Sequence, residues 1–452
     1  MRSFSLLFPL LLLATHLALA GSSANASSAA PSLAPAPGAR ISDVTKTGYF
    51  TEPSIAVDPN NPQHVVVAYQ VPTSVVWSQD GGRDWKKADG TASKEYKVSG
   101  DVSIAYDTKG SAILAYLAFD KLGTFNYWAH NATRNGLFVR RSLDGGKTWE
   151  AQERAVVSHP SDPGIPFEDK PYVFADLTHG AHAGNVYIGW TEFSLTKTII
   201  LFAHSSDGGA SWAVPLEIST HEGLPRDDNG AVEGFTGAVA PDGTVYAAWA
   251  DGNGIAFTSS HDGGESFAPS HSIISTAPLY FGVADTARCN GFPQMGVDAR
   301  SGLLYLIWSD YRNGGVNVFA STSSNGGETW SDAVRVNSNP PHDGTDQFTQ
   351  WLAVDPASGA ANVIFYDRRN DAENKNATVT LARSTDGGKT FANYAWTTSG
   401  FAGKGDFIGD YIGIAANGDR VFGAWTEKPS KEKHKHKTVV RVGLADFSSP
   451  SK

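Results

Sequence analysis

SLDGGKTW, at residues 142–149, is the stretch that decides the fold, because the chain repeats it. Asp followed by two Gly residues is typical of a tight turn, since Asp accepts local backbone hydrogen bonds and Gly adopts positive φ without steric cost. Related octapeptides begin at Ser78, Ser205, Ser260, Ser323 and Ser384, so the turn occurs six times. Successive copies lie 64, 63, 55, 63 and 61 residues apart, which indicates one repeated structural unit.

Pairs of apolar segments accompany these turns. The first segment of a pair ends in small residues and Asp, as in SIAVDPN at 54–60, and the second follows at once, as in HVVVAY at 64–69. Such pairs occur seven times, and the last, which ends at Trp425, has no Asp-Gly turn after it. Radial repetition of four-stranded antiparallel units leaves few open strand edges. The pattern therefore predicts an all-β, seven-bladed β-propeller in which six blades carry the turn between their third and fourth strands.

The seventh unit lacks a fourth strand of its own. The segment ARISDVTKTG at 39–48 precedes the first unit, and we expect it to pair as the missing strand and close the ring. An unpaired edge would be costly, although a loose N-terminal arm is the alternative. Residues 1–20 have the basic start, apolar centre and A-x-A ending of a signal peptide, and residues 21–39 have the Ser, Ala and Pro content of a flexible tether. Residues 40–452 then form a single propeller domain of a secreted or periplasmic protein.

Composition excludes several classes of protein. The net charge of −10 disfavours a general nucleic-acid binder. The apolar run within residues 1–20 is short for a membrane span. Cys289 is the only cysteine, so no internal disulfide can form, and no zinc or calcium loop spacing is present. We expect a monomer that uses no metal or other cofactor.

The meander order of the strands sends the loops of each blade to two opposite faces. The six Asp-Gly turns share one face, and we interpret them as structural staples of the blades. The connections between blades are long, polar and unlike one another, and they share the second face with the loops between second and third strands. Because irregular loops on a rigid scaffold are where function concentrates, we expect the functional site on this second face.

Acids and amides begin the first strand of each repeat, close to the expected ring axis. They are Glu52, Asp101, Asp169, Glu233, Asn290, Gln347 and Asp410. Crowded carboxylates raise one another's pKa values and suit general acid–base catalysis, with a solvated polar channel as the alternative. Arginines on the same rim match carboxylates bidentately and favour an anionic sugar. They are Arg226, Arg288, Arg312, Arg368 and Arg369, and we expect some of them to pair with Asp310 and Asp367.

The repeated turn resembles the Asp-box, or BNR, repeat of the sialidase superfamily, and this resemblance covers residues 40–447. Sialidases act with a Tyr nucleophile paired to a Glu, with an Asp acid/base and with three arginines on the sialate carboxylate. By resemblance, VEGFTGAV at 232–239 points to Glu233, and GDYIGIAA at 409–416 points to Tyr411. Asp101 then becomes the possible acid and Arg312 the best match for a carboxylate-binding arginine. The chain departs from the family in having Glu52 where sialidases carry an arginine, and in having seven blades instead of six.

The resemblance implies an exported enzyme that removes a terminal acidic sugar, sialic or uronic acid, from a glycan by hydrolysis. Two alternatives stay open. One is a uronate-directed lyase on the same propeller, with His221, His342 and Tyr411 as candidate proton-transfer groups, and the other is a non-catalytic glycan- or protein-binding propeller. We expect Glu233, Tyr411 and Asp169 to converge with Arg312, Arg368 and Arg369 at the mouth of the axial channel. Arg226, Asp310, Asp367 and His342 are the further expected substrate-binding residues.

Overall fold

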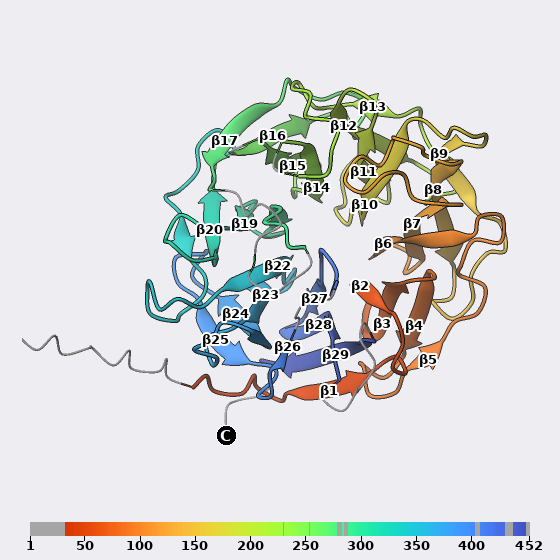
Figure 1. The fold of residues 1–452 in the computed structure, drawn as a ribbon. Helices are drawn as coiled ribbons and strands as arrows, with labels where there is room; N and C mark the ends of the chain where they lie inside the picture. Colours follow the sequence, from red (N-terminus) through yellow and green to blue (C-terminus); the bar gives the residue numbers. More distant parts are fainter. Residues whose placement is uncertain are drawn as a thin grey trace, which may run out of the picture.

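Seven four-stranded antiparallel sheets are arranged around a central axis in the computed structural model (Figure 1). The structure describes residues 32–448 except 229, 253, 278–282, 284–287, 403–406 and 430–436. The predicted signal peptide and the first part of the predicted tether lie outside these residues. The observed architecture confirms the all-β, seven-bladed propeller that the repeats predict.

The first six blades each use strands that are consecutive in the chain, with the innermost strand first. Blades one and two are β2 (Thr51–Asp58), β3 (Asn61–Gln70), β4 (Ser74–Ser78) and β5 (Lys86–Lys87), then β6 (Val98–Tyr106), β7 (Ala112–Phe119), β8 (Asn135–Ser142) and β9 (Arg154–His159). Blades three and four are β10 (Phe167–Ala175), β11 (Val186–Phe193), β12 (Thr198–Ser205) and β13 (Leu216–Glu217), then β14 (Val232–Val239), β15 (Val245–Asp251), β16 (Gly254–Ser260) and β17 (His271–Ser275). Blades five and six are β18 (Gln294–Val297), β19 (Leu304–Asp310), β20 (Asn317–Ser323) and β21 (Val334–Arg335), then β22 (Gln347–Val354), β23 (Ala361–Asp367), β24 (Asn376–Ser384) and β25 (Ala392–Ala395), with β26 (Phe401–Ala402) beside β24.

The seventh blade joins the two ends of the chain. Its inner strands are β27 (Gly413–Asn417), β28 (Arg420–Glu427) and β29 (Val439–Asp446), and its outermost strand is β1 (Arg40–Asp43). β1 pairs antiparallel with β29, from Arg40 opposite Leu444 to Asp43 opposite Arg441 (Figure 1). Backbone hydrogen bonds continue beyond β1, from Val44 N to Val440 O at 3.0 Å. The predicted closure of the ring by the segment before the first blade is therefore confirmed.

The described end of the predicted tether is bound to the sixth blade. The backbone N–H of Ala36 donates to the carbonyl of Ala395 at 3.0 Å, and the N–H of Ala395 donates to the carbonyl of Ala34 at 2.8 Å. The Ala36 residue is only 3% exposed. Composition alone predicts flexibility here, but small side chains also allow this close backbone contact, so residues 34–37 are not loose.

Each repeated turn is held by its own Ser and by the side chain two residues later, which is Asp in five copies and Asn325 in the sixth, as the copy at 142–149 shows. The hydroxyl of Ser142 donates to Oδ1 of Asp144 at 2.8 Å, and the same oxygen accepts from the backbone N–H groups of Lys147 at 3.1 Å and Thr148 at 2.9 Å. Gly146 has φ of 97°, and a Cβ built on it would lie 2.2 Å from Cγ1 of Val66 in the preceding blade. The turn therefore packs one blade against the next.

Tryptophans on the second strands fill the space between blades. Trp190, Trp249, Trp308 and Trp425 are fully buried. The indole N–H of Trp190 donates to Glu168 at 2.6 Å, and that of Trp308 donates to Asp310 at 2.9 Å. These two hydrogen bonds satisfy buried indole N–H groups, while the rings pack between blades, as Trp190 does with Ile113 and Leu137 of the second blade.

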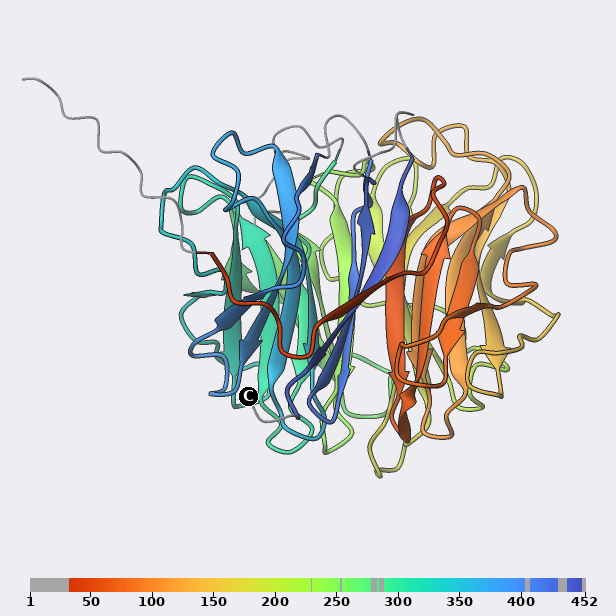
Figure 2. The same cartoon turned by 90° about the horizontal axis from the view of Figure 1, so that it is seen from below.

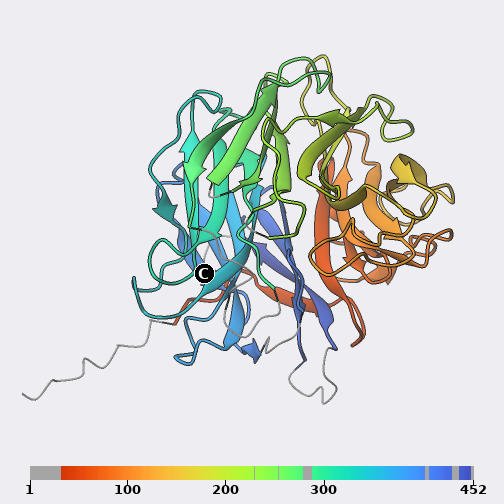
Figure 3. The same ribbon diagram turned by 45° about the horizontal axis from the view of Figure 1, so that its top comes forward.

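The strands run roughly along the ring axis, as Figure 2 and Figure 3 show, so each blade sends its loops to only two faces. Among the described residues, no helix has the length and apolarity that crossing a lipid bilayer requires.

Candidate functional site

Five innermost strands carry a β-bulge near the end at which they begin. In each bulge one residue has positive φ: Glu52 (54°), Asp101 (47°), Lys170 (49°), Gly234 (73°) and Thr349 (51°). A left-handed backbone costs a residue other than glycine about 1–2 kcal/mol, and bulges re-aim the side chains they carry. The first three blades therefore hold their charged bulge residues in strained conformations at equivalent places around the axis.

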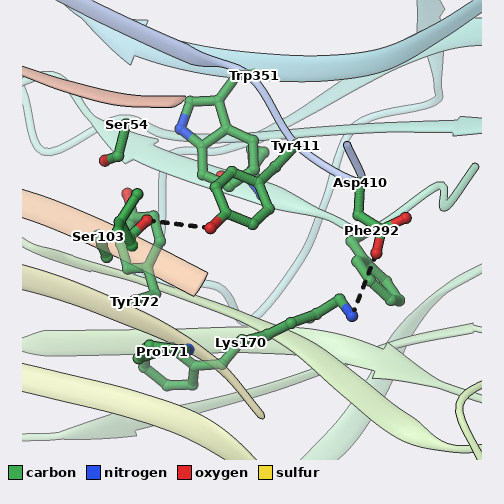
Figure 4. A pocket seen from close by; sticks show the side chains of 13 residues that line it. Ser54, Ser103, Lys170, Pro171, Tyr172, Phe292, Trp351, Asp410 and Tyr411 are labelled. Carbon is green, nitrogen blue, oxygen red and sulfur yellow. Dashed lines mark hydrogen bonds and ion pairs between the residues drawn. The ribbon is translucent and has the colours of Figure 1, made fainter. Parts of the chain in front are cut away.

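The ammonium group of Lys170 lies within a buried group of carboxylates. Its Nζ is 3.0 Å from Oε1 of Glu233 and 3.5 Å from an oxygen of both Asp169 and Asp410. Figure 4 shows the lysine side chain extended toward Asp410. All three carboxylate residues are buried, and a buried charge requires a partner of opposite sign. Lys170 is that partner for three carboxylates, which come from three different blades.

Arg288 is the second cation of this cluster. Its Nη1 donates to Asp227 at 2.5 Å, its Nε donates to Asp410 at 2.9 Å, and its Nη2 donates to the second oxygen of Asp410. The indole N–H of Trp128 also donates to Asp227, at 3.1 Å, and the backbone N–H of Asp410 donates to Glu52 at 2.9 Å. A continuous set of contacts therefore connects Trp128 to Glu52.

Burial raises the pKa of several of these carboxyl groups. Burial, together with the charge of Asp410, raises the pKa of Glu52 to about 8. Burial raises the pKa of Asp169 to about 7 against the attraction of Lys170, and Asp101 adds to the rise. Burial and then the charge of Glu52 raise the pKa of Asp101 as well. Asp169 in turn lowers the pKa of Asp101 while Asp101 raises that of Asp169, so the two carboxyl groups titrate as a pair.

Two other carboxyl groups respond to the cluster in opposite ways. The pKa of Asp410 is lowered despite its burial, because Arg288 and Lys170 attract its charged form. The pKa of Glu233 is raised well above its usual value by burial and then by the charge of Asp227. Environment thus separates acids that hold a proton from acids that stay ionised.

Three acids of the cluster have a spacing that could suit a metal ion. Single oxygens of Asp169, Asp227 and Glu233 all lie within 4.8 Å of one another. The ammonium of Lys170 already contacts two of these residues, at 3.0 and 3.5 Å. We infer that the chain's own lysine supplies the positive charge that these acids require.

A cavity of about 870 Å³ opens over the cluster, on the face that carries the connections between blades. Its floor includes Glu52, Asp101, Asp169, Lys170 and Arg288. Its walls are largely apolar and comprise Tyr49, Val71, Leu117, Phe119, Leu122, Phe125, Trp128, Phe167 and Phe407, among other residues. None of the six repeated turns contributes a described residue to the lining, which agrees with a structural role for the turns.

A smaller cavity of about 40 Å³ lies next to the first one, and Lys170 lines both (Figure 4). Tyr411 lines the smaller cavity, where its hydroxyl donates to the carbonyl of Val102 at 3.2 Å. Its ring centroid lies 5.8 Å from that of Trp351. Burial, followed by the charge of Glu52, raises the pKa of Tyr411 well above 10.

The structure brings only some of the predicted catalytic residues together. Asp101 and Asp169 lie on the floor of the large cavity, and Glu233 joins Asp169 through Lys170. Tyr411 lines the smaller cavity instead. The Tyr–Glu pairing that the resemblance implies is not among the contacts of the structure, because the Tyr411 hydroxyl binds a backbone carbonyl while Glu233 binds Lys170.

The three arginines expected at the channel mouth do not line the large cavity. Arg312 donates to both oxygens of Asp310 at 2.6–3.0 Å, and Arg369 donates to Asp367 at 2.5 Å. The side chain of Arg368 is buried. The expected pairing of rim arginines with Asp310 and Asp367 therefore occurs, and the expected convergence of these arginines with the axial acids does not. Arg312 and Arg369 are each bound by the carboxylate that lies two residues earlier in the chain, so their guanidinium groups do not face the axial acids.

The remaining predicted binding residues also lie away from the large cavity. Arg226 forms an ion pair with Asp228. His221 is exposed, with its Nδ1 3.4 Å from Asp251, and His342 is exposed in the connection before β22. None of the three is among the residues that line the cavity.

Sequence reasoning missed Lys170, Asp227 and Trp128, and placed Arg288 on the rim without a partner. One signal could have found the lysine. When the innermost strands are aligned on their bulges, Lys170 takes the same place as Glu52 and Asp101. No comparable signal marks Asp227, Arg288 or Trp128, because all three lie in irregular connections.

Comparisons with known proteins give similarity at the level of solved structures alone. No family model matches the chain, and no curated protein matches it. Among solved structures it is similar to a Hadza microbial sialidase (TM-score 0.49, 16% identity, 86% of this chain and 75% of that one). It is also similar to an α-L-arabinofuranosidase from Fusarium graminearum (0.49, 13%, 76% and 97%) and to a leech intramolecular trans-sialidase (0.46, 14%, 90% and 69%). Similarities this low carry no argument about function, and the fold rests on the blade topology.

Proposed function

We propose that this protein is a glycoside hydrolase that cleaves a glycosidic bond on the floor of the large cavity. The Asp101–Asp169 pair carries the proposal: both carboxyl groups line an open cavity, burial raises the pKa of each, and the pKa of Asp169 is about 7. Glycoside hydrolysis needs a carboxyl group that still holds its proton for the leaving oxygen, and in this proposal Asp169 supplies it. The second carboxylate of the reaction must lie about 5 Å or more from the first, so it is another member of the charge cluster.

The other floor residues have supporting roles in this proposal. The ionised member of the pair stabilises the positive charge that develops on the sugar ring, and Asp410, which does not line the large cavity, binds Lys170 and Arg288. Lys170 and Arg288 fix the positions of these carboxylates through the contacts described above. Floor residues held by several contacts need little reorganisation during the reaction.

We propose an anionic sugar, sialic or uronic acid, as the group that binds at the floor. Lys170 and Arg288 are cations that line the cavity, and their positive charge favours an anionic group there. Protonation of Asp169 near neutral pH would release part of the charge of Lys170 for the sugar carboxylate.

We also propose that the protein acts outside the cytoplasm, on the strength of the signal-peptide pattern in residues 1–20, and that it is a monomer, because a closed propeller leaves only short strand edges for a second chain. N-terminal sequencing of the exported protein should show cleavage after Ala20, and its mass in solution should be that of one chain. An uncleaved start or a dimer mass would contradict this part of the proposal.

A panel of aryl glycosides tests the reaction. It comprises a sialoside, a glucuronide, an arabinofuranoside and neutral hexosides, and release of the aryl group is measured for the wild type and for Asp101→Asn. We expect hydrolysis with a preference for an anionic sugar, and a loss of at least about 100-fold in kcat for the variant, the usual size of a general acid–base contribution. An unsaturated uronate product would identify a lyase, and binding without turnover would identify a binding propeller. Equal rates for the two proteins would place the chemistry elsewhere.

A further inference from the structure

We infer that the substrate carries an apolar aglycone, an alkyl or aryl group, that binds against the walls of the large cavity. The term aglycone rests on the proposed hydrolysis, whereas binding of an apolar group to these walls can be measured without any turnover.

Exposed apolar side chains gather at the rim of this cavity. Five large hydrophobic residues that line it keep much of their surface in solvent: Tyr49 (63% exposed), Val71 (43%), Leu122 (45%), Phe125 (74%) and Phe407 (38%). Single exposed hydrophobic residues need no explanation, but several that surround one concave site mark a surface that a partner or ligand covers. They come from four different connections around the cavity, so no single loop accounts for the patch.

The apolar surface continues from the rim toward the floor. Leu117, Phe119, Trp128 and Phe167 line the same cavity and are buried. The rings of Phe119 and Phe167 meet edge to face with centroids 5.6 Å apart, and those of Phe125 and Trp128 do so at 6.0 Å. An apolar ligand group that enters from solvent can therefore contact apolar side chains from the rim to the charged floor.

The connection between β7 and β8, which carries much of this wall, is held in place by hydrogen bonds. The backbone N–H of Lys121 donates to the Thr133 hydroxyl at 2.8 Å, and that hydroxyl donates to the carbonyl of Lys121 at 2.7 Å. The indole of Trp128 donates to Asp227, whose own backbone N–H donates to the carbonyl of Asn126 at 2.8 Å. The wall is thus organised before any ligand binds, which lowers the entropic cost of binding.

Size and polarity favour a ligand with one polar end and one apolar end. The cavity of about 870 Å³ lies in the upper part of the range of about 300–1,000 Å³ that is found for drug-sized ligands, and it exceeds what one sugar ring fills. Five of its seven charged lining residues lie at the floor; the other two, Asp120 and Lys121, lie in the wall, where Asp120 is ion-paired with Arg134. The sugar therefore belongs on the floor and the aglycone belongs along the walls.

The test measures binding of n-alkyl β-D-glucosides, from methyl to octyl, to the full-length protein by titration calorimetry below their micelle-forming concentrations. Affinity should rise by up to about fourfold for each methylene buried against the walls. Phenyl and naphthyl glucosides form a second arm, which shows whether flat rings or flexible chains bind better. Because the sugar is constant, the differences report on the apolar group alone.

Two matched variants link the effect to the wall. Leu122→Ala should weaken octyl glucoside binding by about three- to tenfold and leave methyl glucoside binding unchanged, since it removes apolar contact area alone. Leu195→Ala is the control, because Leu195 is also a leucine, is 49% exposed and does not line the cavity. It should leave both affinities unchanged.

The outcomes separate this inference from the proposed hydrolase. Affinities that do not depend on the apolar group, or equal effects of the two leucine variants, would overturn the apolar subsite even if a glycoside is hydrolysed. Length-dependent binding that Leu122→Ala weakens would support the subsite, and failure of every glycoside to react would then refute the hydrolase alone.

Discussion

Replacing Glu52 with glutamine should stabilise the protein at alkaline pH and change its stability little at acidic pH. Glu52 is buried, and burial together with the charge of Asp410 raises its pKa from 4.5 to about 8. Between these two values the folded protein holds a proton that the unfolded chain has lost. Stability falls with rising pH wherever the folded state binds more protons, so the ionisation of Glu52 destabilises the wild type progressively as the pH rises to about 8.

The structure sets the size of this effect. At about 1.4 kcal/mol per pKa unit, full titration of Glu52 would cost the folded state no more than about 5 kcal/mol. Asp101 and Asp169 also hold raised pKa values and share this cost, so we expect Glu52→Gln to increase the free energy of unfolding by about 1–3 kcal/mol near pH 8.5. Glutamine can still accept the hydrogen bond from the backbone N–H of Asp410, so the folded contact is kept.

Urea unfolding at about pH 5, 7 and 8.5 measures the effect for the wild type, Glu52→Gln and the exposed control Glu328→Gln. The wild type and the control should lose stability from acidic to alkaline pH, and Glu52→Gln should lose less. If Glu52→Gln destabilises the protein equally at all three pH values, Glu52 is already ionised in the folded state. The account of a proton-holding floor would then be wrong.

Three further predictions concern the turns, the closing strand and the cavity wall. Asp144→Ala should lower the free energy of unfolding by about 1–2 kcal/mol through its lost turn hydrogen bonds, without changing ligand affinity; weaker binding by the folded variant would place this turn at the site. In urea, a chain that begins at residue 48 should unfold earlier than one that begins at residue 39, because it lacks β1, and equal midpoints would show that pairing with β29 adds no stability. Trp128→Phe keeps an aromatic ring but loses the hydrogen bond to Asp227, and it should lower kcat/KM by at least about tenfold. An unchanged kcat/KM would mean that the wall and the charge cluster act independently.

The blades were predictable because their signals are local in the sequence. An Asp-Gly turn, the strand after it and the apolar pair before it lie within one repeat, and a count of seven pairs against six turns shows that a strand must come from elsewhere. That count predicts the pairing of β1 with β29. The contact of Ala36 with Ala395 has no such signal, because it depends on the shape of the sixth blade.

The site was predictable only where a residue begins a strand. Asp101 and Asp169 were expected because they are acids near the start of an innermost strand, whereas Lys170 is a base at the bulge position of Glu52 and Asp101, and only an alignment on the bulges identifies it. The role of Arg312 was hidden for a different reason. From its position on the rim, Arg312 could face either the cavity or Asp310. In the structure its guanidinium group binds the carboxylate of Asp310.

The most direct test compares Asp169→Asn with Arg312→Ala on the glycoside that the wild type hydrolyses fastest. Asp169 lies on the cavity floor, where burial raises its pKa to about 7, whereas Arg312 is bound to Asp310 and does not line the cavity. The account predicts that Asp169→Asn lowers kcat by at least about 100-fold and that Arg312→Ala changes kcat/KM by less than about threefold. Full activity of Asp169→Asn, together with a large loss for Arg312→Ala, would contradict it and move the site to the arginine rim.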